Sequence, residues 1–63
     1  MTKIEMVEEM FAEMCAELNL EWYELYDSEK FEDFEKLVAD KFGANYLESK
    51  EYSDWTNEMY WDL

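Results

Sequence analysis

Apolar residues recur at intervals of three and four along most of the chain, which is the spacing that places side chains on one face of an α-helix. In the first part of the chain this stripe consists of Ile4, Val7, Phe11, Met14, Leu18, Trp22 and Leu25. Thr2 precedes the stripe, and Glu5 lies three residues after Thr2. This is the spacing of a capping box, which satisfies two free backbone N–H groups at the start of a helix. The pattern predicts one helix from about residue 3 to residue 25.

This first helix could end at Asn19, because asparagine is often found at the residue where a helix ends. Leu20 falls on the opposite side of the helical wheel from the stripe, so a break near Asn19 is left open. Residues 18–22 also alternate as a short strand would. Helix is favoured because both flanks are helical and no turn residues frame a hairpin.

A second helix is predicted over about residues 28–42. Asp27 and Ser28 are candidate caps at its start, and Gly43 stands where a left-handed residue commonly follows a helix end. The apolar residues between them share one face, with Leu37 beside it; they are Phe31, Phe34, Val38 and Phe42.

The last twenty residues predict a helical turn and a third helix. The segment 44–50 is less regular and is interpreted as a turn that carries Tyr46 and Leu47 inward. Ser53 is the candidate cap of the last helix. After it, one face combines Tyr52 with Trp55, Met59 and Leu63.

We therefore expect residues 1–63 to form a single all-α domain, a compact bundle of three or four short helices joined by short connections. The absence of Pro and the single Gly leave few turn signals for a β-rich fold. The single cysteine, Cys15, cannot form an internal disulfide and is interpreted as a small buried apolar residue. With no apolar run long enough for a span and no secretory signal, a cytoplasmic location is expected.

Composition then narrows the function. Eighteen acidic residues against five lysines give a formal net charge of −13. Phosphate repels such a chain, so we expect no direct binding of nucleic acid and no binding to anionic membranes. The Phe, Tyr and Trp content of 19% distinguishes the chain from disordered acidic segments, which contain few aromatic residues.

The acidic residues form two rows with a spacing of four, which makes neighbours on a helix surface. If the first helix is continuous, its row extends about 24 Å. The second row lies in the last helix, with Trp61 on the same side and away from the face of Trp55 and Met59. We predict that these residues bind a partner: Glu5, Glu9, Glu13, Glu17 and Glu21 in the first acidic row, and Glu51, Asp54, Glu58, Trp61 and Asp62 in the second.

No motif indicates catalysis or a cofactor. The chain has no His to activate Cys15 or a serine, and it lacks the His and Cys set of a zinc site. Asp27, Glu29 and Asp33 lack the spacing of an EF-hand and its glycine. No glycine-rich loop is present to hold a phosphate. We therefore expect a protein that is not an enzyme and that uses neither a metal nor a cofactor.

In charge and size the chain resembles the small acidic DNA-mimic inhibitors of bacteriophages and mobile elements, the anti-CRISPR and anti-restriction proteins. The resemblance covers composition over the whole chain and involves no shared motif. It implies an inhibitor that occupies a basic nucleic-acid-binding groove of a bacterial host complex, with a CRISPR effector as the first candidate. The partner would then be a basic protein in the host cytoplasm, whose Arg and Lys side chains pair with carboxylates as they do with phosphates.

Two alternatives remain open. The acidic rows are also consistent with a solvated surface that only aids solubility. The number of aromatic residues also favours a helical interaction module, such as an adaptor, an antitoxin or an oligomerisation element, and leaves a homodimer open; these residues are Trp22, Tyr23, Tyr26, Trp55, Tyr60 and Trp61.

Overall fold

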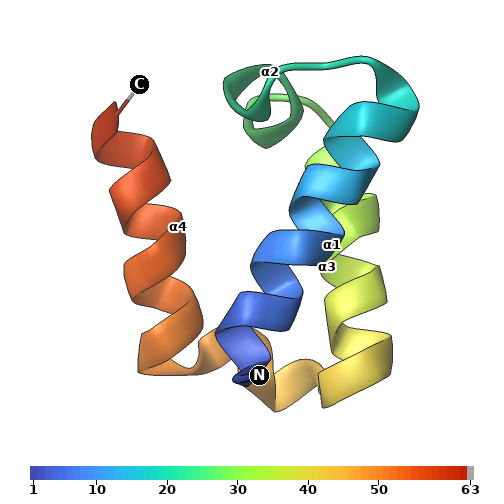
Figure 1. The fold of residues 1–63 in the computed structure, drawn as a ribbon. Helices are drawn as coiled ribbons and strands as arrows, with labels where there is room; N and C mark the ends of the chain where they lie inside the picture. The colour runs from blue at the N-terminus through green and yellow to red at the C-terminus, as the bar shows by residue number, and fades with distance from the viewer. Residues whose placement is uncertain (63) are drawn as a thin grey trace.

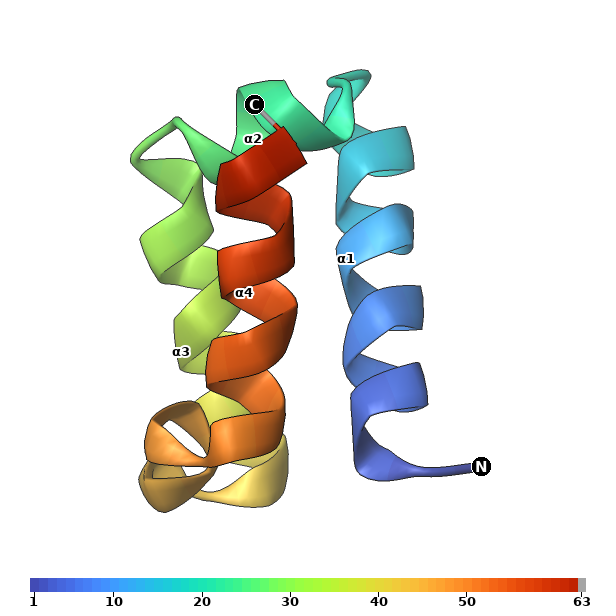
Figure 2. The ribbon, with the colours of Figure 1, turned by 90° about the vertical axis from the view of Figure 1, so that its left-hand side faces the viewer.

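The computed structural model describes residues 1–62 and confirms an all-α bundle, with no strand in that range. Helices α1 (Lys3–Leu18), α3 (Lys30–Phe42) and α4 (Lys50–Asp62) run up, down and up (Figure 1). The short helix α2 (Trp22–Tyr26) crosses one end of the bundle, and the 3-10 turn η1 (Ala44–Glu48) closes the other (Figure 2). The prediction that Leu63 shares the inward face of the last helix lies outside the described residues. No helix in residues 1–62 combines the length and apolar character of a membrane span.

The start of α1 is the predicted capping box. The Glu5 backbone N–H donates to Thr2 Oγ1 at 3.3 Å, and the Thr2 N–H donates to Glu5 Oε1 at 3.1 Å. These two bonds satisfy groups that the first turn of a helix leaves without partners. The cap therefore fixes where α1 begins.

The end of α1 decides between the two predictions for this region. Asn19 adopts a left-handed conformation with φ 56° and ψ 43°, so the continuous helix to Leu25 is wrong and the break near Asn19 is confirmed. The Asn19 N–H donates to the Ala16 carbonyl at 3.3 Å and the Leu20 N–H to the Cys15 carbonyl at 2.9 Å. This pair of bonds is a Schellman motif, which satisfies the last carbonyls of the helix.

The break changes where the following residues lie. Because α2 turns across the end of the bundle, Leu25 is fully buried whereas Trp22, predicted on the inward stripe, retains an exposed fraction of 36%. Leu20, which a continuous helix would place opposite the stripe, instead packs against the core. Glu21 is the extended N-cap residue before α2 and does not continue the row of carboxylates on α1.

The left-handed residue gives a first testable prediction. Replacing Asn19 by Ala should lower the free energy of unfolding by about 1 kcal/mol, because a Cβ-bearing residue without a helpful amide resists this conformation. Replacing it by Gly should leave stability unchanged or raise it slightly. Urea denaturation of both variants checks this, and an Ala variant as stable as the Gly variant would contradict the assigned helix end.

The connection after α3 follows the prediction in part. Gly43 has a positive φ of 96°, but its ψ of 147° is extended rather than left-handed helical. Its N–H donates to the Ala39 carbonyl at 2.7 Å, which closes the last turn of α3. The predicted turn is present as η1, where Tyr46 is buried and Leu47 packs against the core.

Helix α4 begins earlier than predicted, so the Ser53 cap is wrong. Ser49 takes that role, since its Oγ accepts a bond of 3.3 Å from the Tyr52 N–H. Ser53 lies inside the helix, where its N–H donates to the Ser49 carbonyl at 3.0 Å. The sequence contains serine at both positions. Ser49 becomes the cap because η1 ends there and its backbone is extended, with φ −69° and ψ 153°.

The core is a small cluster dominated by aromatic rings. The Phe11 ring lies 5.2 Å from that of Phe34 and 5.4 Å from that of Trp55, the latter edge to face. Cys15, predicted as buried, is only partly buried because it lies at the edge of the stripe. Burial, followed by the charge of Glu21, raises the pKa of its thiol. The buried residues are Val7, Phe11, Leu25, Phe34, Val38, Tyr46 and Tyr52.

Two buried phenols donate hydrogen bonds to carboxylates, one exposed (Glu51) and one partly buried (Glu35). The Tyr46 hydroxyl donates to Glu51 Oε2 at 2.6 Å, and the Tyr52 hydroxyl donates to Glu35 Oε2 at 3.0 Å. Burial, the hydrogen bond and the carboxylate charge raise the pKa of Tyr46 to about 12. The same three causes raise the pKa of Tyr52 further.

These phenols predict loss of stability in alkali. In the unfolded chain a tyrosine ionises near pH 10, whereas the folded protein keeps both protons. The stabilisation is therefore complete below about pH 10 and declines as pH rises towards the pKa of the folded state. Melting temperatures above and below pH 10 check this. Replacing both tyrosines by Phe should flatten the decline, and a decline of equal size in that variant would contradict the assignment.

Candidate acidic binding surface

The residues predicted to bind a partner are exposed. This holds for the five glutamates of the first acidic row and for the acids of the second. Trp61, the indole predicted to lie among carboxylates, has an exposed fraction of 81% and packs edge to face on exposed Tyr60. The structure thus leaves both rows accessible, but it gives their members different surroundings.

The first acidic row is shorter and more curved than predicted. Glu21 lies beyond α1, as the N-cap residue of α2. The row on α1 therefore contains Glu5, Glu9, Glu13 and Glu17 and extends about 18 Å. A step of four residues turns about 40° beyond a full helical turn, so the row winds about 120° around α1. It is a spiral strip that leads towards α3 rather than a straight line of charge.

Glu5 differs from the other members of this strip. Its carboxylate accepts bonds from the Thr2 backbone N–H and the Thr2 hydroxyl, which together lower its pKa. Within residues 1–62, Glu9, Glu13 and Glu17 form no ion pair or side-chain hydrogen bond. These three carboxylates are the members free to bind a partner.

The second acidic row also divides. Asp54 pairs with Lys50 Nζ at 3.2 Å, the only ion pair in residues 1–62, and Glu51 accepts the Tyr46 hydroxyl bond. These two residues already have internal partners. Glu58 and Asp62 have none in the described part of the chain, so they are the freer members.

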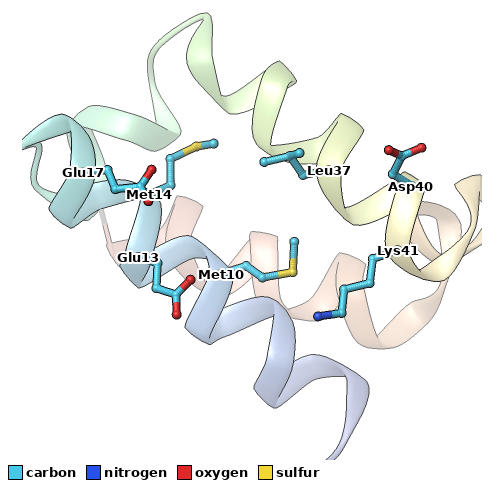
Figure 3. A pocket seen from close by; sticks show the side chains of 7 residues that line it. All are labelled: Met10, Glu13, Met14, Glu17, Leu37, Asp40 and Lys41. Carbon is cyan, nitrogen blue, oxygen red and sulfur yellow. The ribbon is translucent and has the colours of Figure 1, made fainter.

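The strip on α1 ends at a groove between α1 and α3, which sequence reasoning did not predict. This α1–α3 groove has a volume of about 450 Å³, and Figure 3 shows its lining side chains. Met10 and Met14 face Leu37 across it, and Glu13 and Glu17 lie along the α1 edge. The available signal was the spacing of four residues between Met14, which belongs to the apolar stripe, and Met10.

The α1–α3 groove combines apolar and charged groups in a way that suits a protein partner. Leu37 has an exposed fraction of 49%, although it lies in the middle of a helix. Methionine side chains are flexible and adapt to different apolar partners. Asp40 and Lys41 complete the α3 edge, so three carboxylates face one ammonium group. The groove is therefore apolar at its floor and negative at its edges.

The uncompensated charge predicts a salt-dependent stability. The spiral strip contains three pairs of like charges four residues apart, and together they lower the free energy of unfolding by about 1 kcal/mol. Salt screens the repulsion between such exposed charges. The melting temperature should therefore rise by about 4–8 °C between low and high salt. Calorimetry at the two salt concentrations measures this, and neutralising Glu9, Glu13 and Glu17 should reduce the rise. An unchanged melting temperature would show that the strip carries no repulsive free energy.

Comparison with protein-family models, curated proteins and solved structures gave no match to this chain. The site is therefore assigned from its own geometry. Its groups are carboxylates, thioethers and aromatic rings. Carboxylates on a helix surface can pair with guanidinium and ammonium groups, and the apolar side chains can bury a side chain of the same partner. The arrangement supports binding of a basic protein surface.

Proposed function

We propose that the protein is an inhibitor that binds a basic nucleic-acid-binding groove of a host defence complex, with a CRISPR effector as the narrowest form of the proposal. The observation that carries it is the set of three free carboxylates in the spiral strip. They are exposed on α1 and have no lysine partner in residues 1–62: Glu9, Glu13 and Glu17. By occupying the groove, the inhibitor excludes the nucleic acid.

The geometry of the strip supports mimicry of a phosphate backbone. Successive carboxylates follow one another at about 6 Å along α1, compared with about 3.4 Å between phosphates along one strand. Arg side chains that bind phosphate can bind carboxylate in the same bidentate manner. The strip leads to the α1–α3 groove, where Met10, Met14 and Leu37 offer the apolar contact that charge alone lacks.

The charge of the whole chain supports rapid and salt-sensitive association. A net charge of −13 on a body of 27 × 24 × 23 Å produces a strong negative field. Such a field attracts a basic groove before contact and raises the association rate. Salt should weaken the complex chiefly because it screens this attraction and slows association.

A capture experiment from bacterial lysate at two salt concentrations tests the proposal. The expected result is a basic nucleic-acid-binding protein or complex that is retained at low salt, released at high salt and displaced by added duplex. Capture only of proteins without nucleic-acid-binding activity would contradict the proposal.

A second candidate function rests on the exposed pair Tyr60 and Trp61. Their exposed fractions of 59% and 81% suit an interaction module that binds through aromatic anchors. Binding of this kind should survive high salt and should be lost when both residues are replaced by Ala. It should be unaffected by charge changes at Glu9, Glu13 and Glu17, which separates the two candidates.

A further inference from the structure

A second groove lies between α1 and α4, two helices that run parallel with α4 standing opposite α1 (Figures 1 and 2). This α1–α4 groove has a volume of about 340 Å³. Its apolar lining comes from α1 and α4, with one indole from α2: Phe11, Ala12 and Cys15 of α1, Trp22 of α2, and Trp55 and Met59 of α4. Glu8 on α1 and Asp62 on α4 also line it, and no basic residue in the described part of the chain does.

Side-chain size explains why the groove is present. Trp55 reaches from α4 to the Phe11 ring, with ring centres 5.4 Å apart, and this contact supports the floor. Above it, α1 offers the small side chains of Ala12 and Cys15. Small residues on one helix opposite large residues on the other leave a hollow that a further side chain can fill.

The lining indicates the chemistry of the occupant. Indole rings attract cations to their faces, and Trp22 and Trp55 both line this groove. Glu8 and Asp62 favour positive charge at the edges, while the floor favours an apolar side chain. A second copy of this chain carries a net charge of −13 and is therefore repelled from these edges.

We propose that the α1–α4 groove docks a basic amphipathic helix of a partner protein. The apolar face of that helix lies between α1 and α4 as an additional helix of the bundle, and its Arg or Lys side chains pair with Glu8 and Asp62. This mode of recognition places an amphipathic helix in an apolar groove. It goes beyond the proposed mimicry, because Glu8 and the aromatic floor lie outside the spiral strip on α1.

Tryptophan fluorescence offers a direct test. Replacing Trp61 by Phe leaves Trp22 and Trp55, which both line the groove, as the only indoles in the chain. This variant is titrated with an amphipathic peptide of Leu and Lys, about 18 residues long so that it can form a helix. We expect a saturable change in emission, and a much weaker one with a peptide of the same composition whose order destroys the apolar face.

Two pairs of variants locate the binding. In the Trp61→Phe background, Ala12→Gln places a larger side chain in the groove and should weaken binding by about tenfold or more. Ala16→Gln changes an exposed residue of the same helix outside the groove and should have no effect. Likewise, Glu8→Gln should weaken binding by about two- to fivefold. Glu48→Gln changes the net charge equally at an exposed site of η1 that lines neither groove, and it should have a smaller effect.

Several outcomes would overturn the proposal. Equal binding by the Ala12 and Ala16 variants, each shown to be folded by circular dichroism, would place the peptide elsewhere. Equal binding of both peptides would reduce the interaction to general charge attraction. A dimer in sedimentation that Ala12→Gln dissociates would identify a second copy as the occupant. Failure of the nucleic-acid competition leaves these measurements unaffected, so the two proposals fail independently.

Discussion

Phe34→Ala should leave the protein largely unfolded at room temperature. Phe34 is fully buried, and its ring lies 5.2 Å from that of Phe11, 5.7 Å from that of Phe31 and 6.1 Å from that of Trp55. Removing a buried Phe ring costs about 3–5 kcal/mol. A single core in a chain of this length supplies only about 3–5 kcal/mol, so one substitution consumes most of the stability.

Circular dichroism and urea denaturation measure the effect, and Leu37 supplies the control. Leu37 lies on the same helix with half of its surface exposed, so Leu37→Ala should cost less than about 1 kcal/mol. A Phe34→Ala protein that unfolds cooperatively near the wild-type midpoint would contradict the position of the core. The comparison separates loss of the core from any general intolerance of α3 to alanine.

Replacing Glu9, Glu13 and Glu17 together by Gln should weaken binding to the basic target by about tenfold to a hundredfold. These carboxylates have no internal partner in residues 1–62, so neutralising them should leave the fold intact or stabilise it slightly. The loss should lie in the interface and should be largest at low salt. Affinity and melting temperature are measured on the same samples.

A variant of matched charge distinguishes position from total charge. Asp27→Asn, Glu29→Gln and Glu48→Gln also remove three charges, but they act at exposed sites in and beside the connections between helices. This control should retain most of the affinity, apart from a slower association. Equal losses of affinity in the two triple variants would show that net charge alone, and not the position of the carboxylates on the spiral strip, determines binding.

Local patterns predicted the helical elements well because they depend on neighbouring residues. The Thr2 and Glu5 cap, the apolar face of α3 and the turn around Tyr46 all follow from spacings of three and four. The end of α1 was ambiguous for a physical reason. The apolar stripe continues in phase past Asn19, and only the left-handed conformation of that residue shows that the chain turns.

The binding surface was predictable in composition but not in shape. Exposure of the two acidic rows follows from their positions outside the apolar stripes. The grooves depend on how the helices are placed relative to one another, which no spacing within one helix determines. The hydrogen bond of Glu51 likewise depends on how η1 places Tyr46 against α4, whereas the pair of Asp54 with Lys50 is a local contact four residues apart within α4. The pattern of acids showed how many carboxylates are available, and the helix cap at Thr2, the Lys50 pair and the contact with η1 decide which of them remain free.

Displacement of nucleic acid from the captured target is the most direct test of the proposed mimicry. A labelled duplex is bound to the target at low salt, the protein is added in increasing concentration, and fluorescence polarisation reports the fraction of duplex still bound. We expect complete displacement by the wild-type protein and by the Asp27, Glu29 and Glu48 variant, and much weaker displacement by the Glu9, Glu13 and Glu17 variant. Simultaneous binding of protein and duplex to the target, with polarisation that does not fall, would contradict the proposed mimicry.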